Sequence, residues 1–340
     1  MRILWLRPSK GDNISVRRER IAEKLEAEDF EVVIKDAGGL DLPSAIWTTL
    51  RGDFDVIAGN VRVGLFIGYP LARLLRKPFL GDVSDPISDI DYLPELLFRF
   101  FQWYEWQILK RADAVVFVYE SSYQEAIERG IDDAERLPNS VDYELFADPD
   151  ELVVEEAADI LHRSGVDTEK PIAIYLGVFS ERYCIRDIID AAEQTPEWEF
   201  VFVGETGLTD EVSEAAAQLE NVSYPGSFPY RLMPGFLAHA DVGFCFKDAE
   251  QPLKLKEYGA AGIPAIVRYG ELERWYDSDE LVFVEPNGEA ISDALMWLKA
   301  DETARRRYGE KLERRSAECS WADIANRYRE LFEALGGQRD

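Results

Sequence analysis

Short apolar runs alternate with longer amphipathic segments along nearly the whole chain. A short apolar run bounded by turn residues predicts a buried strand, and apolar residues three or four positions apart predict a helix. In the first half, strands are expected at Arg2–Leu6, Glu31–Lys35, Asp55–Gly59, Pro78–Asp82 and Ala114–Tyr119, and helices at Ser15–Glu28, Gly64–Arg76, Pro94–Arg111 and Ser121–Arg129. This alternation is typical of βαβ units, so it favours an α/β fold with parallel sheets.

The alternation restarts after an acidic stretch, Asp148–Thr168, that is expected to act as a hinge. Strands are expected at Ile172–Leu176, Glu199–Val203, Val222–Tyr224, Val242–Phe246, Ala265–Arg268 and Leu281–Val284, and helices at Ile185–Gln194, Asp210–Leu219, Tyr230–His239, Pro252–Ala261, Ala290–Lys299, Asp301–Glu318 and Trp321–Leu335. We therefore expect two doubly wound domains, residues 1–165 and residues 166–318. Domains of this kind bind ligands at the carboxyl ends of their strands, which predicts a cleft where the two sheets face each other.

Charge narrows the classes of partner. The chain has 340 residues, with 66 acidic against 38 basic ones and a formal net charge of −28. Such a surface repels phosphate, which argues against a nucleic-acid binder. Only 11 of the basic residues are lysines. An acid-rich, lysine-poor surface suits concentrated salt, where screening removes self-repulsion. We therefore expect a salt-accumulating cytoplasm, such as that of a halophilic archaeon.

The low number of cysteines and histidines argues against two further kinds of structure. The three cysteines have no paired spacing and there are only two histidines, which argues against a disulfide framework and a zinc site. No metal ligands are predicted. The first apolar run is too short for a signal peptide, and no run is long enough to cross a bilayer, so a soluble cytoplasmic protein is expected. Glycine-rich dinucleotide and P-loop motifs are also absent.

The segment from Ala240 to Pro264 is the most informative part of the sequence. It reads as a buried strand, an acidic loop, a short helix opened by Pro252 and a glycine stop. Lys254 and Glu257 are three residues apart, so they share a face near the N-terminus of that helix, where free N–H groups attract anions. A carboxylate one turn along can accept two hydrogen bonds from a ribose diol. A plain Lys–Glu surface pair is the alternative.

Pro252–Pro264 resembles the donor-binding signature of GT-B glycosyltransferases, above all the retaining family 4 (group 1) enzymes with their E-x7-E motif. The similarity extends over most of the chain, through Ala112–Val118, Leu137–Asp142, Asn221–Asp241 and two strand-end glycines, Gly177 and Gly204. It implies two Rossmann-like domains facing a central cleft. It also implies that residues 319–340 form a helix that crosses back onto the N-terminal, acceptor-side domain, while residues 166–318 bind the nucleotide sugar.

The chain departs from the family pattern at the donor site. Ala249 stands where the first glutamate of E-x7-E is expected, with Asp248 and Glu250 beside it. Val178 and Cys184 replace the family's phosphate-binding arginine and lysine. The resemblance implies Glu257 on the ribose. Our assignment then gives Arg182 and Lys254 the diphosphate, and makes Glu250 a catalytic carboxylate that contacts the sugar.

Basic residues interrupt the acidity near the N-terminus. Residues 1–20 carry six basic and two acidic side chains, a net +4. Arg17 and Arg18 lie in the first turn of a helix, where cations oppose the dipole, which suggests a bound anion such as a donor diphosphate or a lipid-linked acceptor phosphate. A solvated helix start compensated by neighbouring acids is the alternative. The loop Pro8–Ser15 is expected to face the cleft, and Asn60 and the catalytic candidate Asp85 to lie near the acceptor.

The segment Leu93–Arg111 is apolar nearly all round. Helices of this kind are usually buried, which is the expected outcome. The alternative is an exposed helix that meets a bilayer interface or a lipid acceptor, giving peripheral contact at the inner face of the membrane.

The resemblance implies transfer of a sugar from a nucleotide-diphosphate donor to a hydroxyl acceptor, lipid-linked or glycan, with retention and without a metal or other cofactor. Closure about residues 148–168 would exclude water. The alternative is a catalytically silent GT-B homologue that binds a nucleotide sugar or serves as a scaffold, because three family site residues are replaced. A nucleotide-sugar 2-epimerase is disfavoured, since its acid–base residues usually include histidines that this chain lacks.

Overall fold

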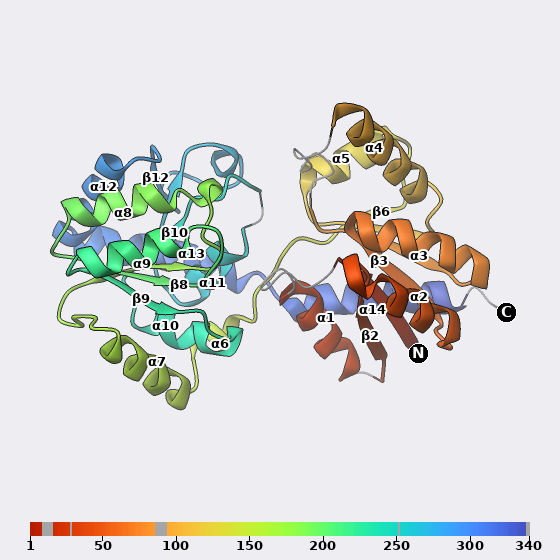
Figure 1. Cartoon of the computed structure of the whole chain (residues 1–340), viewed down its shortest axis with the longest axis horizontal. Coiled ribbons are helices and arrows are strands. Elements are labelled where there is room, and N and C mark those ends of the chain that lie inside the picture. Colours follow the sequence, from red (N-terminus) through yellow and green to blue (C-terminus); the bar gives the residue numbers. More distant parts are fainter. Residues whose placement is uncertain (9–15, 28, 86–93, 251, 338–340) are drawn as a thin grey trace. The chain divides into compact units, whose positions relative to one another are not determined.

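The computed structural model describes residues 1–8, 16–27, 29–85, 94–250 and 252–337 (Figure 1). The chain divides into two compact units, Met1–Asn139 with Trp321–Asp340, and Ser140–Ser320. Each unit is built on a six-stranded sheet whose strands pair in parallel. The two parallel α/β units confirm the predicted fold class.

The first sheet has the strand order β2-β1-β3-β4-β5-β6. Its strands are β1 (Arg2–Arg7), β2 (Glu31–Asp36), β3 (Val56–Asn60), β4 (Phe79–Val83), β5 (Ala114–Phe117) and β6 (Ala134–Arg136), and its helices are α1 (Val16–Glu26), α2 (Leu42–Arg51), α3 (Val61–Leu75), α4 (Glu95–Leu109), α5 (Glu120–Glu128) and α14 (Trp321–Gly337). Successive side chains of β1 point to opposite faces of the sheet. Leu4 and Leu6 join the core under α3 and α4, whereas the Trp5 ring lies 5.2 Å from that of Tyr328 on α14.

The second sheet has the order β12-β11-β10-β7-β8-β9. Its strands are β7 (Ile172–Leu176), β8 (Glu199–Val203), β9 (Val222–Gly226), β10 (Val242–Cys245), β11 (Ala265–Arg268) and β12 (Val282–Val284). One face packs against α8 (Ile185–Gln194), α9 (Thr209–Gln218) and α12 (Gly288–Ala300). The other packs against α6 (Tyr143–Ala147), α7 (Glu151–Arg163), α10 (Met233–Ala238), α11 (Leu253–Ala260) and α13 (Glu302–Ala317).

Both strand orders reverse direction once, which fixes where ligands can enter each unit. In the first sheet the order reverses between β1 and β3, and in the second between β7 and β10. Connections leave such a point toward opposite faces, so a crevice opens beyond the carboxyl ends of the two strands. From the strand order, each unit is therefore expected to bind ligands at one such crevice, at the ends of β1 and β3 or of β7 and β10.

The boundary expected at residue 165 is wrong. Residues 140–165 belong to the second unit, because Ala157, Ile160 and Leu161 of α7 are buried in one core with Phe236 of α10. The stretch 148–168 is therefore no hinge, since it forms a helix inside that unit. The chain passes between the units at Asn139–Ser140 and returns at Ser320–Trp321, so the C-terminal helix packs with the first unit as expected.

The predicted elements are present, with three additions and one change, and the third addition is the short helix α6. The sequence pattern missed α2 and the short strand β6, and the helix expected at Tyr230–His239 is a 3-10 turn, Tyr230–Leu232, followed by the short α10. None of the helices in the described part of the chain is both long and apolar enough to cross a membrane.

Candidate functional site

Two glycines form the carboxyl edge of the second sheet. Gly177 follows β7 with φ +118°, and Gly204 follows β8 with φ +144°. A Cβ atom on Gly204 would lie 1.9 Å from the carbonyl oxygen of Gly177. The Gly177 N–H donates to the carbonyl of Val203 at 2.7 Å. Only glycine permits this approach and these dihedral angles, so a ligand can come close to bare backbone here.

Lys254 projects from the first turn of α11 over this edge. A Cβ atom on Gly177 would lie 3.2 Å from Nζ of Lys254, and that Nζ lies 3.8 Å from the ring centroid of Tyr175 and 5.0 Å from that of Tyr183. Burial lowers the pKa of Lys254 to about 8, although Cys245 and Glu257 act in the opposite direction. An anion at this place would restore the stability of the ammonium form.

Glu257 lies one turn further along α11 and is 5 % exposed. Its Oε1 accepts a hydrogen bond of 2.8 Å from the hydroxyl of Tyr230, on the 3-10 turn after β9. A buried carboxylate held by tyrosine is not a solvated surface partner for Lys254. The interpretation as a plain surface pair is therefore wrong, since Glu257 is buried in the second unit while Lys254 is half-buried.

The two carboxylates on either side of Ala249 differ in their exposure to solvent. Asp248 is exposed, and its Oδ1 accepts a hydrogen bond of 2.8 Å from the Glu271 N–H. Glu250 is 4 % exposed. Both follow β10, one of the two strands at the switch point of the second sheet. Of the two, Glu250 is the one withdrawn from solvent.

The two arginines after Gly177 have different surroundings. Arg186, at the start of α8, is bound by Glu181 and by both carboxylate oxygens of Glu211. These hydrogen bonds raise the pKa of Arg186 and occupy its guanidinium. Arg182 lies on the 3-10 turn Glu181–Tyr183 and is exposed. Of these two arginines, Arg182 therefore remains the candidate for binding the donor diphosphate.

A buried polar network lies at the carboxyl ends of β3 and β4 in the first unit. Nδ2 of Asn60 donates to Oδ2 of Asp82 at 3.1 Å and to Oγ of Ser84 at 2.9 Å. The hydroxyl of Tyr328 on α14 donates to Oδ1 of Asp82 at 2.9 Å. Asn60 is fully buried, and within the described residues its Oδ1 has no hydrogen-bond partner. The network thus keeps an unused acceptor beside the switch point of the first sheet.

Arg18 joins this network from the first turn of α1. It is 3 % exposed, and its Nη1 donates to Oγ of Ser84 at 3.3 Å. Burial lowers the pKa of Arg18, and the charges of Asp82 and Asp85 oppose that shift. Its Nε has no hydrogen-bond partner among the described residues. The structure therefore brings Arg18 and Asn60 together, with Asp85 close enough to act on Arg18 electrostatically.

Arg17 does not have the predicted role. Its Nη2 donates to the carbonyl of Leu137 and its Nη1 to that of Pro138, each at 2.8 Å, and Nη2 also reaches the hydroxyl of Tyr328 at 3.3 Å. Both terminal nitrogens are thus used to tie α1 to the end of β6 and to α14, so the anion-binding expectation is wrong for this residue. The loop Pro8–Ser15 lies outside the described residues from position 9 onward.

Sequence reasoning missed the aromatic residues that support these sites. Tyr230 and Tyr175 hold Glu257 and Lys254, and Tyr328 closes the network around Asp82. Tyr175 lies within the apolar run that marked a strand, and Tyr328 within an amphipathic helix. The only available signal was their position just before a strand-end glycine or within the returning C-terminal helix.

Comparison with known proteins finds similarity to glycosyltransferases. Residues 157–315 match the family described as Glycosyl transferases group 1. The chain is 27 % identical over 219 residues to the putative teichuronic acid biosynthesis glycosyltransferase TuaH of Bacillus subtilis (strain 168), a match that covers 59 % of this chain. It spans 53 % of that relative, about half its length.

Solved structures match over nearly the whole chain. Sucrose-phosphate synthase from Thermosynechococcus elongatus superposes with a TM-score of 0.79 at 17 % identity, covering 99 % of both chains. Anabaena HepE, whose structure was solved in complex with UDP and glucose, gives 0.78 at 16 % identity, covering 98 % of this chain and 100 % of that one. At these identities the likeness establishes the fold, which is the expected GT-B fold.

Proposed function

Because the chain contains a Glycosyl transferases group 1 domain on a GT-B fold, we propose that it moves a sugar from a nucleotide-diphosphate donor to a hydroxyl acceptor. One observation carries the proposal. Glu257 is buried and accepts a hydrogen bond from Tyr230, and Lys254 lies over Gly177. Both residues lie at the crevice expected for the second sheet. A carboxylate and a cation one helical turn apart match the two polar ends of a nucleoside diphosphate, its ribose diol and its phosphates.

Each donor-side residue has a separate task. Glu257 accepts hydrogen bonds from the ribose hydroxyls, and Lys254 and Arg182 neutralise the charge that develops on the departing diphosphate. The bare backbone at Gly177 and Gly204 lets the phosphates approach. Glu250 contacts the transferred sugar. These cations replace a metal ion, and the sugar is transferred with retention of configuration.

The network of the first unit would serve the acceptor. Arg18 Nε and Asn60 Oδ1 are a buried donor and a buried acceptor without partners in the described part of the chain. Unpaired buried polar atoms are costly, so a ligand that pairs with both gains the energy lost in their desolvation. A hydroxyl or phosphate group of the acceptor offers that pairing, and Asp85 supplies the carboxylate beside it.

Calorimetry with UDP, GDP and ADP tests the donor assignment. Glu257→Gln should weaken nucleotide binding at least tenfold, since it removes a buried charged acceptor worth about 1.5–3 kcal/mol. Glu193→Gln, an exposed glutamate on α8, is the matched control and should bind like the wild type. Equal affinities for all three proteins would refute the ribose assignment. Transfer rates unchanged by EDTA support the metal-free mechanism, and donor binding without turnover of any nucleotide sugar would favour the silent homologue.

The acceptor is proposed to be lipid-linked, because α4 presents an apolar face to solvent. Leu96, Leu97, Phe100 and Trp103 are 47 to 81 % exposed, whereas Trp106, Ile108 and Leu109 are buried. The burial expected for the whole segment is therefore wrong for its N-terminal half, while Leu93 lies outside the described residues.

The charge around this face supports a membrane as the occupant. The α4 helix packs beside α3, with the Phe66 ring 5.0 Å from that of Tyr104. Residues 61–77 and 95–112 together carry seven basic and two acidic side chains. Two of those basic residues, Arg73 and Lys77, pair with Asp113 and Asp53 just outside these ranges, so the local excess of positive charge is smaller than the count of +5. A basic surface with exposed aromatic and aliphatic side chains suits the headgroup region of an anionic leaflet.

Co-sedimentation with vesicles tests this contact. The wild-type chain should bind vesicles that contain phosphatidylglycerol more strongly than vesicles of phosphatidylcholine alone. Phe100→Ser should reduce that binding several-fold, because each large apolar side chain contributes about 1.5–3 kcal/mol on burial. Leu152→Ser, at a still more exposed position on α7 of the second unit (72 % against 54 % for Phe100), should have no effect. Binding that is insensitive to both substitutions would exclude this surface.

A further inference from the structure

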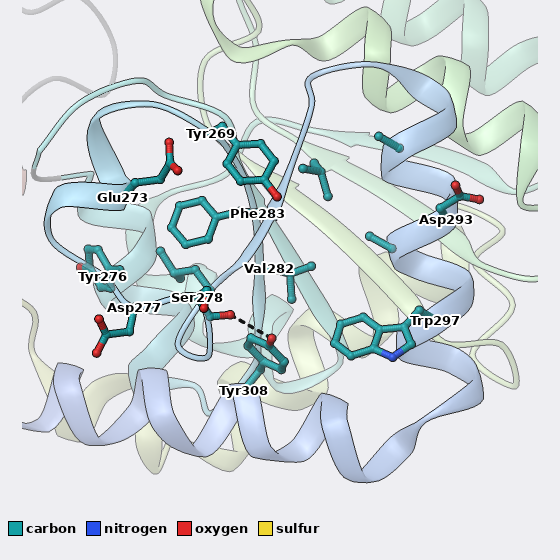
Figure 2. A pocket seen from close by; sticks show the side chains of 14 residues that line it. Tyr269, Glu273, Tyr276, Asp277, Ser278, Val282, Phe283, Asp293, Trp297 and Tyr308 are labelled. Carbon is teal, nitrogen blue, oxygen red and sulfur yellow. Dashed lines mark hydrogen bonds between the residues drawn. The ribbon is translucent and has the colours of Figure 1, made fainter.

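A cavity of about 560 Å³ lies in the second unit, beside the strand that ends its sheet. Its floor is β12, and its walls come from the turn Glu271–Arg274 with the loop after it, from α12 and from α13 (Figure 2). The volume is that of an ordinary small-molecule site. None of the residues assigned to the donor or the acceptor lines it.

Aromatic rings stand on opposite sides of the floor. On one side Tyr269 stacks on Phe283, with ring centroids 5.7 Å apart and planes 24° from parallel. On the other side, across Val282, Trp297 meets Tyr308 edge to face at 5.7 Å and 86° (Figure 2). The residues Tyr269 and Trp297 are 45 % and 39 % exposed. Two flat apolar surfaces therefore flank the cavity.

These rings are held in place before any ligand arrives. The hydroxyl of Tyr308 donates to the carbonyl of Ser278 at 3.0 Å, which fixes the ring against which Trp297 rests (Figure 2). Tyr269 is anchored through its backbone, because its N–H donates to the carbonyl of Val284 at 3.2 Å, the last residue of β12. A site whose aromatic walls are fixed loses little conformational entropy on binding.

The charged side chains that line the cavity are all acidic. Glu273, Asp277 and Asp293 line it, and none of the 14 described lining residues is a lysine or an arginine. Carboxylates repel phosphates, so a nucleotide or a sugar phosphate does not suit this cavity. They accept hydrogen bonds from hydroxyl groups, while the aromatic faces cover apolar C–H surfaces. The ligand should therefore be uncharged, rich in hydroxyls and flat-sided.

We propose that this cavity binds an uncharged saccharide, as a site separate from that of the donor sugar nucleotide. This proposal rests on the proposed transferase function, because a glycosyltransferase binds glycan chains as acceptors or products. The saccharide lies between Tyr269 and Trp297, with its hydroxyls on the carboxylates. The site holds part of an acceptor or product glycan away from the transferred sugar, which lengthens its residence on the protein.

Saturation-transfer NMR on the full chain tests the proposal, with maltotriose, cellotriose and N,N′,N″-triacetylchitotriose as probes. At least one should bind with a Kd near 1 mM, and its ring C–H protons should receive saturation from aromatic side chains. Trp297→Ala and Tyr269→Ala should each weaken binding about tenfold, the loss of one aromatic contact. Trp297→Phe should retain most of the affinity. Met296→Ala changes the adjacent residue, which is equally exposed but does not line the cavity, and should leave binding unchanged.

Several outcomes would overturn the inference. They are the absence of binding by all three trisaccharides, binding that Trp297→Ala and Tyr269→Ala leave intact, or selective binding of tetramethylammonium, which would make the site an aromatic cage for cations. UDP affinity is measured on the same proteins. If UDP binds while the trisaccharides do not, only this site fails, and the reverse result would refute the donor site alone.

Discussion

Glu105 provides the sharpest test of the electrostatics of the first unit. It lies on α4 and is 1 % exposed, and it forms an ion pair with Arg62 of α3, whose Nε lies 3.5 Å from Oε2. Burial raises the pKa of Glu105 from 4.5 to about 7, and Arg62 offsets only part of that shift. In the unfolded chain the same carboxyl titrates near its ordinary value. Glu105→Gln removes this titration while keeping the size of the side chain.

The sign and magnitude follow from proton linkage. Between pH 4.5 and pH 7 the folded state holds a proton that the unfolded state has lost, so the free energy of unfolding falls as the pH rises through this window. The shift from 4.5 to about 7 corresponds to at most about 3.4 kcal/mol, at 1.36 kcal/mol per unit. About 2.5 kcal/mol of this loss falls between pH 5 and pH 8. Glu105→Gln should gain that amount in stability, relative to wild type, over the same interval.

Urea unfolding at pH 5 and pH 8 measures the effect. The quantity compared is the change, from pH 5 to pH 8, in the stability difference between variant and wild type. The cost of burying the glutamine amide is the same at both pH values and therefore cancels. Glu95→Gln, on the same helix at an exposed position paired with Arg99 across 3.8 Å, is the control and should show a difference near zero at both values. A stability difference for Glu105→Gln that does not change with pH would refute the raised pKa.

Four further results are expected. UDP affinity of the wild type should fall as the pH rises through about 8, where Lys254 loses its proton, and Lys254→Met should bind weakly with no such dependence, as read by calorimetry. Arg17→Ala should lower the free energy of unfolding by about 2–4 kcal/mol in urea titrations but leave UDP affinity unchanged, since its guanidinium is bound to backbone carbonyls. Gly204→Ala should cost about 3 kcal/mol or more by the same assay, whereas Gly207→Ala, whose Cβ meets nothing nearer than 4.0 Å, should be tolerated. Thermal unfolding should shift upward as KCl is raised, because screening relieves the repulsion within a chain of −28.

The strands were predictable because parallel strands buried on both faces appear as continuous apolar runs. β7 is such a run, and all of its residues are buried. β6 was missed because Ala134-Glu135-Arg136 is short and polar, at the edge of its sheet. The domain boundary was misplaced for a different reason. The apolar face of α7 shows that the helix packs on something, but not which of two sheets it packs on.

The two residues proposed to bind the donor could be chosen from the sequence because their signal is local. Lys254 and Glu257 share one short helix, so their spacing and the motif around them determine their relation. Arg17 shows the opposite case, because its partners Leu137 and Pro138 follow it by more than a hundred positions. The sequence pattern around a cation in the first turn of a helix is the same whether that cation binds a ligand or a backbone carbonyl far along the chain.

The basic residues of this acidic chain are of two kinds, buried and exposed to solvent. Concentrated salt should weaken anion binding by the second kind and not by the first. Lys254 and Arg18 are withdrawn from water and have lowered pKa values, so their attraction to an anion is little screened. The basic residues around α3 and α4 act across solvent, and at 1 M salt the screening length is only about 3 Å. Nucleotide binding should therefore persist in molar KCl, while vesicle binding loses its preference for anionic lipid. Whatever vesicle binding remains there must come from the apolar face of α4, so the effect of Phe100→Ser should become larger, relative to total binding, as the salt is raised.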